Sequence, residues 1–144
     1  MFSMKTVLHG IIAGIIAGIV FSFFLLMGGM TETLGAIIGM PTITGGLIVH
    51  TIVSIISGIV FAIVFGYFIH SWGTAIILGL LFGFGMWIAG PMTLLPYMAA
   101  GAPLFSKWNL VDLKANIPPL VGHLVYGLLL GIVFYTLRIN QSRL

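Results

Sequence analysis

Four apolar runs of about 20 residues each, almost free of charged side chains, dominate this sequence. The hydrocarbon core of a bilayer takes roughly 20 helical residues to cross. A spanning segment must also satisfy its backbone polar groups internally, which a helix does. We therefore predict transmembrane helices at residues 6–27, 45–68, 74–89 and 118–137. The expected fold class is all-α, a polytopic membrane four-helix bundle that forms a single domain over residues 1–144.

Composition supports a membrane protein and argues against several classes of function. Hydrophobic residues make up 60% of the chain and charged residues 5%, far from the usual composition of a soluble domain. There is no cysteine, which excludes disulfides, thiolate catalysis and iron–sulfur clusters. The only carboxylates, Glu32 and Asp112, lie between the apolar runs, so no acid–base pair is expected within the membrane. For this reason we do not expect an enzyme. We do not expect a nucleic-acid-binding protein either, since the net charge is only +3.

The distribution of basic residues predicts the orientation in the membrane. Three basic residues flank the first and last runs, namely Lys5, Arg138 and Arg143. The two longer connections together carry both signs of charge, from Glu32, Lys107, Asp112 and Lys114. Cytoplasmic segments carry the excess of lysine and arginine. We therefore expect a multi-pass protein of the cell membrane with both termini in the cytoplasm.

Glycine, proline and polar residues mark the connections between the runs. The five residues 69–73 leave room only for a short turn, so the second and third spans are expected to form a tight helical hairpin. Gly90 and Pro91 are expected to end the third span. Residues 92–116, which include Lys107, Trp108 and Asp112, then read as a partly embedded or interfacial loop.

Two segments of the chain resemble each other. When residues 46–61 are aligned with residues 119–134, six of sixteen positions are identical, including His50 with His123. At an offset of 65, Gly14 and Gly18 also fall on Gly79 and Gly83. This pattern predicts two tandem helical-hairpin repeats, about 6–70 and 73–138, in parallel orientation around a pseudo-two-fold axis along the membrane normal. The alternative is chance similarity between glycine-rich apolar helices.

Small residues recur every four positions in all four runs. Such stripes let helix backbones approach closely, because lipid provides no hydrophobic drive for helix association. The spacing is of the GxxxG type and predicts packing within the bundle, with homo-oligomerisation as the alternative. The residues expected to pack helices are Gly10, Gly14, Gly18, Ser54, Gly58, Gly79, Gly83, Gly127 and Gly131.

His50 and His123 are the strongest candidates for a functional site. An ionisable side chain within an apolar run is costly to bury, and the spacing places each histidine on the small-residue face of its helix. Three interpretations are open. Each imidazole hydrogen-bonds across helices to Ser54, Thr51, Tyr126 or a backbone carbonyl; or the pair binds a metal or haem; or it lines a path for protons or a solute.

Methionines on the same side of the membrane bear on the metal hypothesis. Met27 and Met92 lie at corresponding positions in the proposed repeats, near the predicted level of the histidines. Thioether and imidazole ligands together suit Cu(I). Methionine is also an ordinary gap-filling residue in apolar cores. The sequence therefore leaves three alternatives: haem, copper or no cofactor.

The glycine and histidine placements resemble an uncharacterised family of small four-span membrane proteins from bacteria and archaea. The resemblance rests on residues 9–14 and 46–50, on the stripe from Gly79 to Gly83, and on residues 122–131. It implies a fold but no activity.

The expected function is that of a small non-enzymatic integral membrane protein. It would act as an accessory subunit or as a ligand-binding or metal-binding module that uses the His50 and His123 pair. The alternative is a small oligomeric transporter or channel for a metal ion, a proton or a small solute. The lipid bilayer is the expected partner, with a homo-oligomer or a larger membrane complex supplying any protein partner.

Overall fold

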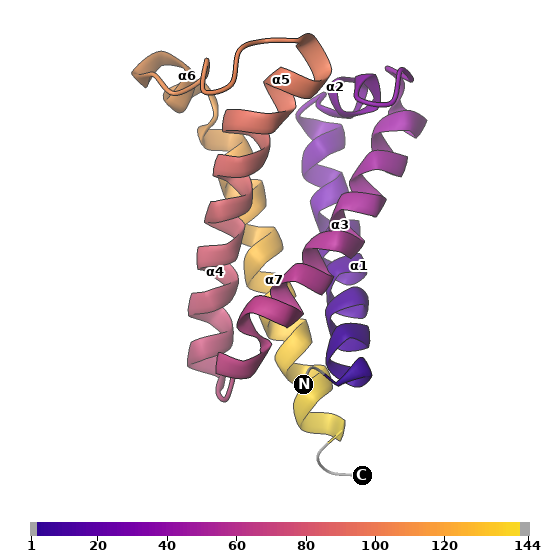
Figure 1. Cartoon of the computed structure of the whole chain (residues 1–144), viewed down its shortest axis with the longest axis vertical. Coiled ribbons are helices and arrows are strands. Elements are labelled where there is room, and N and C mark those ends of the chain that lie inside the picture. Colours follow the sequence, from indigo (N-terminus) through magenta and orange to yellow (C-terminus); the bar gives the residue numbers. More distant parts are fainter. Residues whose placement is uncertain (1–2, 142–144) are drawn as a thin grey trace.

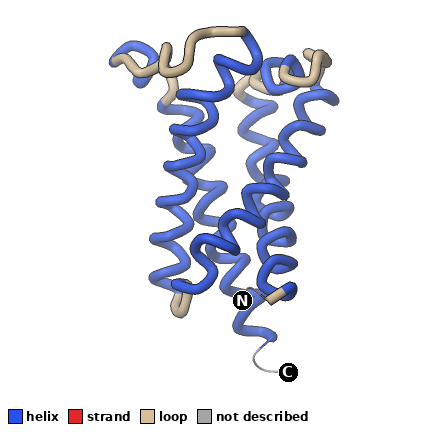
Figure 2. The backbone as a smooth tube through the Cα atoms, in the orientation of Figure 1, coloured by secondary structure: helices blue, strands red, loops and turns tan. Residues whose placement is uncertain are grey.

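The chain folds into an all-α bundle, described here from a computed structural model for residues 3–141 (Figures 1 and 2). Four of its helices are long and apolar enough to cross a membrane, which confirms the predicted number of spans. The long helices are α1 (Met4–Met27), α3 (Ile43–Phe65) with the 3-10 turn η1 (Gly66–Phe68), α4 (Trp72–Ala89) and α7 (Ile117–Gln141). Arg143, which contributed to the predicted orientation, lies outside the described residues.

Short helices gather at one end of the bundle. These are α2 (Thr31–Ala36), α5 (Leu95–Ala100) and α6 (Leu110–Ala115), and we call this the loop end (Figure 1). The start of α1, the end of α7 and the turn between η1 and α4 lie at the opposite end, the termini end. Helix α1 begins and α7 ends on the same side of the bundle, as an even number of spans requires. This agrees with the prediction that both termini lie on one side of the membrane.

The third span is longer than predicted, and the prediction that Gly90 and Pro91 end it is wrong. The chain continues through a π-turn, η2 (Gly90–Leu94), directly into α5, so the apolar helical segment extends from Trp72 to Ala100. Pro91 lacks an N–H and would interrupt regular α-helical bonding. The π-turn accommodates it, and the Thr93 hydroxyl donates to the carbonyl of Ile88 at 2.8 Å. The irregular part of this connection is therefore limited to residues 101–109.

Helix α1 occupies the middle of the bundle. It packs along α3 on one side and along α7 on the other, and α7 in turn packs along α4. The expected tight pairing of the second and third spans is not observed, although only three residues separate η1 from α4. Bulky aromatic rings fill the space between α3 and α4, with Phe61 and Phe65 lying 5.3 Å and 6.0 Å from Phe82 between ring centroids. The two helices are consequently joined at the turn without close backbone contact.

Helices α1 and α3 meet backbone to backbone along a line of small residues. A Cβ atom added at Gly10 would collide with the carbonyl oxygen of Gly58, and one added at Gly14 with the carbonyl oxygen of Ser54. At Gly18 the obstacle would be the Ser54 side chain. These three positions are buried, and no side chain fits at any of them without a shift of the facing helix.

Helices α4 and α7 meet in a similar way at positions that correspond under the offsets seen in the sequence. A Cβ atom at Gly79 would collide with the carbonyl oxygen of Gly127, and one at Gly83 with the carbonyl oxygen of His123. A Cβ atom at Gly131 would meet the carbonyl oxygen of Ala75, just as one at Gly58 would meet that of Gly10. The two helix pairs thus make equivalent close contacts. The whole bundle is less regular, because α1 packs closely along α7 whereas α3 and α4 meet mainly through large side chains.

At the termini end, an arginine links α7 to the segment that follows α3. The Arg138 guanidinium on α7 donates to the carbonyl oxygens of Gly66 and Ile69, which follow the last turn of α3. Ile69 itself is fully buried. A cation at the C-terminal end of a helix satisfies free carbonyl groups and opposes the negative end of the helix dipole. This contact fixes the turn between η1 and α4 to the last span.

Candidate functional site

The two candidate histidines lie in the half of the bundle near the loop end. His50 is in the second turn of α3 and His123 is in the second turn of α7, and both helices begin at the loop end (Figure 1). The Phe21 ring on α1 contacts both imidazoles, with centroid distances of 5.3 Å to His50 and 4.8 Å to His123. Helix α1 therefore brings the two histidines to a common aromatic ring, although α3 and α7 are not packed along each other.

His50 is buried and hydrogen-bonded across helices. Its Nε2 atom lies 2.8 Å from the carbonyl oxygen of Gly18 on α1. A carbonyl oxygen can only accept, so Nε2 carries the proton and donates. The Ser54 hydroxyl lies 3.5 Å from the same nitrogen. The tautomer fixed in this way leaves the lone pair on Nδ1, which has no hydrogen bond within the described part of the chain.

His123 is partly buried and is held within its own helix. Its Nδ1 atom donates to the carbonyl oxygen of Pro119 at 2.8 Å, one turn earlier in α7. Pro119 is followed four residues later by His123, so the bond lies along the helix and does not join two helices. The lone pair is then on Nε2, for which the described residues supply no hydrogen bond. That nitrogen lies toward Gly90, where an added Cβ would be 3.9 Å away.

Polar side chains continue from His50 into the middle of the bundle. Ser54 and Ser57 are buried on the same helix, and Tyr126 is buried on α7. The Tyr126 hydroxyl donates to the carbonyl oxygen of Ser54 at 3.2 Å. Ser57 donates to the Met86 sulfur on α4 at 3.9 Å. This polar row, defined as His50, Ser54, Ser57 and Tyr126, crosses an otherwise apolar interior.

The two candidate methionines are in different environments. Met92, in η2, is only 4% exposed, whereas Met27 at the end of α1 is 89% exposed. A buried thioether near the loop end could serve as a soft ligand, but one that points away from the bundle could not contribute to an interior site. Of the two, only Met92 is buried inside the bundle.

The described residues 3–141 contain no group of three or more histidine, aspartate or glutamate side chains that could hold a metal ion. A metal bound at His50 and His123 would therefore have at most these two imidazoles and would need further ligands of another kind. Thr51, one of the predicted partners of the histidines, faces away from them and donates to the Leu47 carbonyl of its own helix at 2.8 Å.

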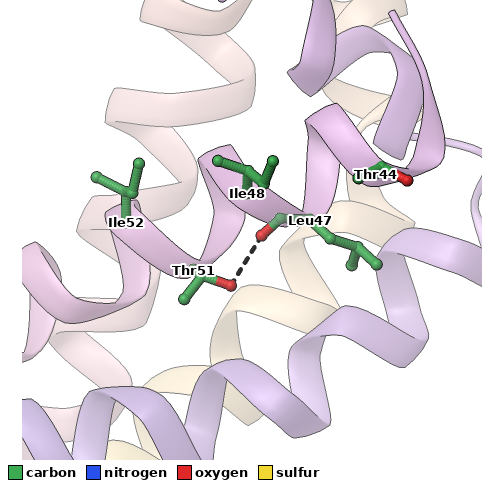
Figure 3. Close-up of a pocket in the computed structure, with 5 residues that line it drawn as sticks. All are labelled: Thr44, Leu47, Ile48, Thr51 and Ile52. Carbon is green, nitrogen blue, oxygen red and sulfur yellow. Dashed lines mark hydrogen bonds between the residues drawn. The ribbon is translucent and has the colours of Figure 1, made fainter. Parts of the chain in front are cut away.

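A shallow groove of about 380 Å³ lies on α3, away from the polar row (Figure 3). Thr51 and its neighbours on the same helix line it, and the Thr51 hydroxyl already bonds its own backbone. The lining residues are Thr44, Leu47, Ile48, Thr51 and Ile52. The groove is thus an uneven strip on the exposed side of α3, without a convergent set of polar groups.

Sequence reasoning missed three members of the site. Phe21, Ser57 and Met86 had no distinguishing pattern, because phenylalanine, serine and methionine are common in apolar helices. For Phe21 a weak signal was available, since it follows Gly18 by three residues and so lies on the small-residue face of α1. Its role depends on α7 lying beside α1, which no spacing within α1 could reveal.

No protein-family model, curated protein or solved structure matches this chain. Of the suggested resemblance to small four-span membrane proteins, only the presence of four long apolar helices is supported. The chain is thus placed as a four-span integral membrane protein with an all-α bundle, by its own composition and geometry.

Proposed function

We propose that this chain is a small non-enzymatic membrane protein that binds a ligand or metal ion at His50 and His123. One observation carries the proposal: each imidazole donates one N–H to a backbone carbonyl, and the lone pair of its other nitrogen accepts no hydrogen bond from residues 3–141. Metal-ligating histidines almost always donate their second ring nitrogen in this way, which fixes the tautomer and the orientation of the ring.

Copper and haem iron are the groups that best fit the donors. Neutral imidazole suits both metals, and the buried thioether of Met92 would favour Cu(I). The Phe21 ring, which touches both imidazoles, would form an apolar wall of the site. Since the described residues place no third histidine or carboxylate with the pair, the remaining ligands would come from a thioether, from the ligand itself or from a partner protein.

Elemental analysis of the full chain in mild detergent tests the proposal. Iron or copper close to one equivalent is expected in the wild-type protein and is expected to be lost from the H50A/H123A double variant. His70→Ala is the matched control, because His70 is exposed in the turn at the termini end. Equal metal content in all three proteins, or no uptake after titration with Cu(I) or haem, would contradict the proposal.

A second candidate function, passage of a proton, metal ion or small solute, is favoured by the polar row. Buried polar side chains within membrane spans often mark transport paths. Four helices enclose little space, so a transporter of this size would act as an oligomer. Flux into liposomes that is lost in H50A/H123A but retained in His70→Ala would support this function over simple binding.

The orientation and the internal duplication belong to the same proposal. Lys5 and Arg138 lie at the termini end, which supports cytoplasmic termini. The equivalent contacts of Gly14 with Ser54 and of Gly79 with Gly127 support two parallel hairpin repeats. A reporter fused after Leu144 would be active only in the cytoplasm if the orientation is right, and activity outside would reverse it.

A further inference from the structure

The connection between α5 and α7 exposes large apolar side chains at the loop end. Leu110 and Val111 at the start of α6 are 76% and 79% exposed, and Phe105 and Trp108 are more than half exposed. These four side chains all lie within residues 105–111, and we call them the apolar rim. A loop that faced water would be expected to turn such side chains inward.

Several polar side chains of the same connection bind one another. Lys107 forms an ion pair with Asp112 at 2.9 Å, and the Asn109 amide donates to the other carboxylate oxygen at 2.6 Å. The Asn109 side-chain oxygen also accepts from the backbone N–H groups of Val111 and Asp112, which caps α6. These contacts lower the pKa of Asp112, chiefly through the hydrogen bonds from Lys107 and Asn109. Lys107, Asn109 and Asp112 are thus bonded to one another, while the side chains of the apolar rim stay exposed.

The apolar rim is held at the level where α7 starts. Only Asn116 separates α6 from α7, and the Trp87 indole on α4 donates to the Asn116 carbonyl at 2.9 Å. The Trp108 indole donates to the Thr93 hydroxyl in η2 at 3.1 Å. Figure 1 shows α6 projecting sideways beyond the ends of α4 and α7. Helix α6 therefore lies to one side of the ends of these two spans and not over the centre of the bundle.

From this placement we infer that the apolar rim, Phe105, Trp108, Leu110 and Val111, inserts into the headgroup region of the leaflet at the loop end. A lipid surface fits better than a second copy of the chain for two reasons. The rim is attached beside the ends of two membrane-spanning helices by the hydrogen bonds of Trp87 and Trp108, and tryptophan is enriched where a chain meets the membrane–water interface. Lys114, which is exposed one turn after Leu110, lies where it can approach lipid phosphates. This inference does not depend on the proposed metal or ligand site.

Site-specific labelling can test the inference, since the natural chain has no cysteine. Leu110→Cys and Val111→Cys, each labelled with the fluorophore NBD, would be placed in vesicles of phosphatidylcholine and phosphatidylglycerol. Thr33→Cys is the matched control, because Thr33 is exposed at the same end, on the polar helix α2. All three substitutions are at exposed positions, and circular dichroism would verify that helix content is unchanged.

We expect the labels in the apolar rim and the label at position 33 to be quenched preferentially by opposite quenchers. Labels at 110 and 111 should be quenched several-fold more by lipids carrying a nitroxide near the headgroup than by aqueous iodide, and the label at 33 should show the opposite preference. Iodide quenching at 110 and 111 equal to that at 33 would overturn the inference. Protection from both quenchers that increases with the protein-to-lipid ratio would also overturn it, and would assign the rim to a contact between copies.

Discussion

Replacement of Gly79 by alanine should disrupt the packing of α4 against α7. An added Cβ atom would collide with the Gly127 carbonyl oxygen and would lie 3.2 Å from the Gly127 carbonyl carbon and 3.3 Å from the Gly131 Cα. All three atoms belong to the backbone of α7, so no side-chain rotation can relieve the clash. Overpacking of this kind costs about 1–3 kcal/mol, and we expect a value near 2–3 kcal/mol because a whole helix must move.

The same helix provides the control. Gly85 on α4 is exposed, and an added Cβ atom there would meet nothing within 4 Å. Gly85→Ala should therefore leave stability unchanged or raise it by up to about 1 kcal/mol, since glycine is the weaker helix former. The predicted difference between the two variants is at least about 2 kcal/mol in the free energy of unfolding.

Titration with a denaturing detergent, followed by far-ultraviolet circular dichroism, would measure this difference. The double variant G79A/G127A provides a second test of the same contact. Gly127→Ala alone would place its Cβ 2.8 Å from the Cα of Gly83, so it pushes the same two helices apart. The double variant G79A/G127A should then lose less stability than the two single variants together, because one separation relieves both clashes. If Gly79→Ala and Gly85→Ala unfold at the same detergent fraction, the backbone-contact argument is refuted.

Three further predictions follow from single contacts. Tyr126→Phe removes the hydrogen bond to the Ser54 carbonyl and should lower stability in the same titration by about 1 kcal/mol; no change would mean that the bond contributes nothing. Arg138→Gln should speed amide hydrogen exchange in the turn between η1 and α4, because the carbonyls there lose a charged donor; unchanged exchange would contradict this. The lowered pKa of Asp112 means that its ion pair with Lys107 stabilises α6 at neutral pH and is lost only as pH falls through a value below the usual 3.8. Emission from a label at position 110 should report that loss, and Asp112→Asn should abolish the transition.

The spans and their approximate limits could be predicted from the sequence, with one clear error. Apolar length is sufficient to identify a membrane helix, because each span satisfies its own backbone. Gly90 and Pro91 misled the prediction, since they are the usual signals of a helix end. The helix continues there through the π-turn η2, which accommodates Pro91, and local rules for proline do not predict such a turn.

The candidate site was predictable only in part. The sequence placed His50 and His123 at a similar level in their helices, and the structure locates both in the half of the bundle at the loop end. Their bonding differs, however: one histidine bonds across helices and the other within its own helix. The spacing of the two histidines is equivalent, so this difference comes from their neighbours. Gly18 of α1 brings a carbonyl within reach of His50, whereas Gly83 of α4 lies against the backbone of His123.

The sequence by itself determined that this is a four-span membrane protein and where small residues line its helices. Both properties depend on composition and on spacing within a single helix. Only the tertiary structure decided that α1 lies between α3 and α7 and that α3 and α4 make no close backbone contact along their length. The physical reason is that a glycine stripe allows close approach without specifying which helix approaches. Which helices become neighbours follows from the bulky side chains between them. Phe61 and Phe82 fill the space between α3 and α4, and Phe21 of α1 packs against His123 of α7.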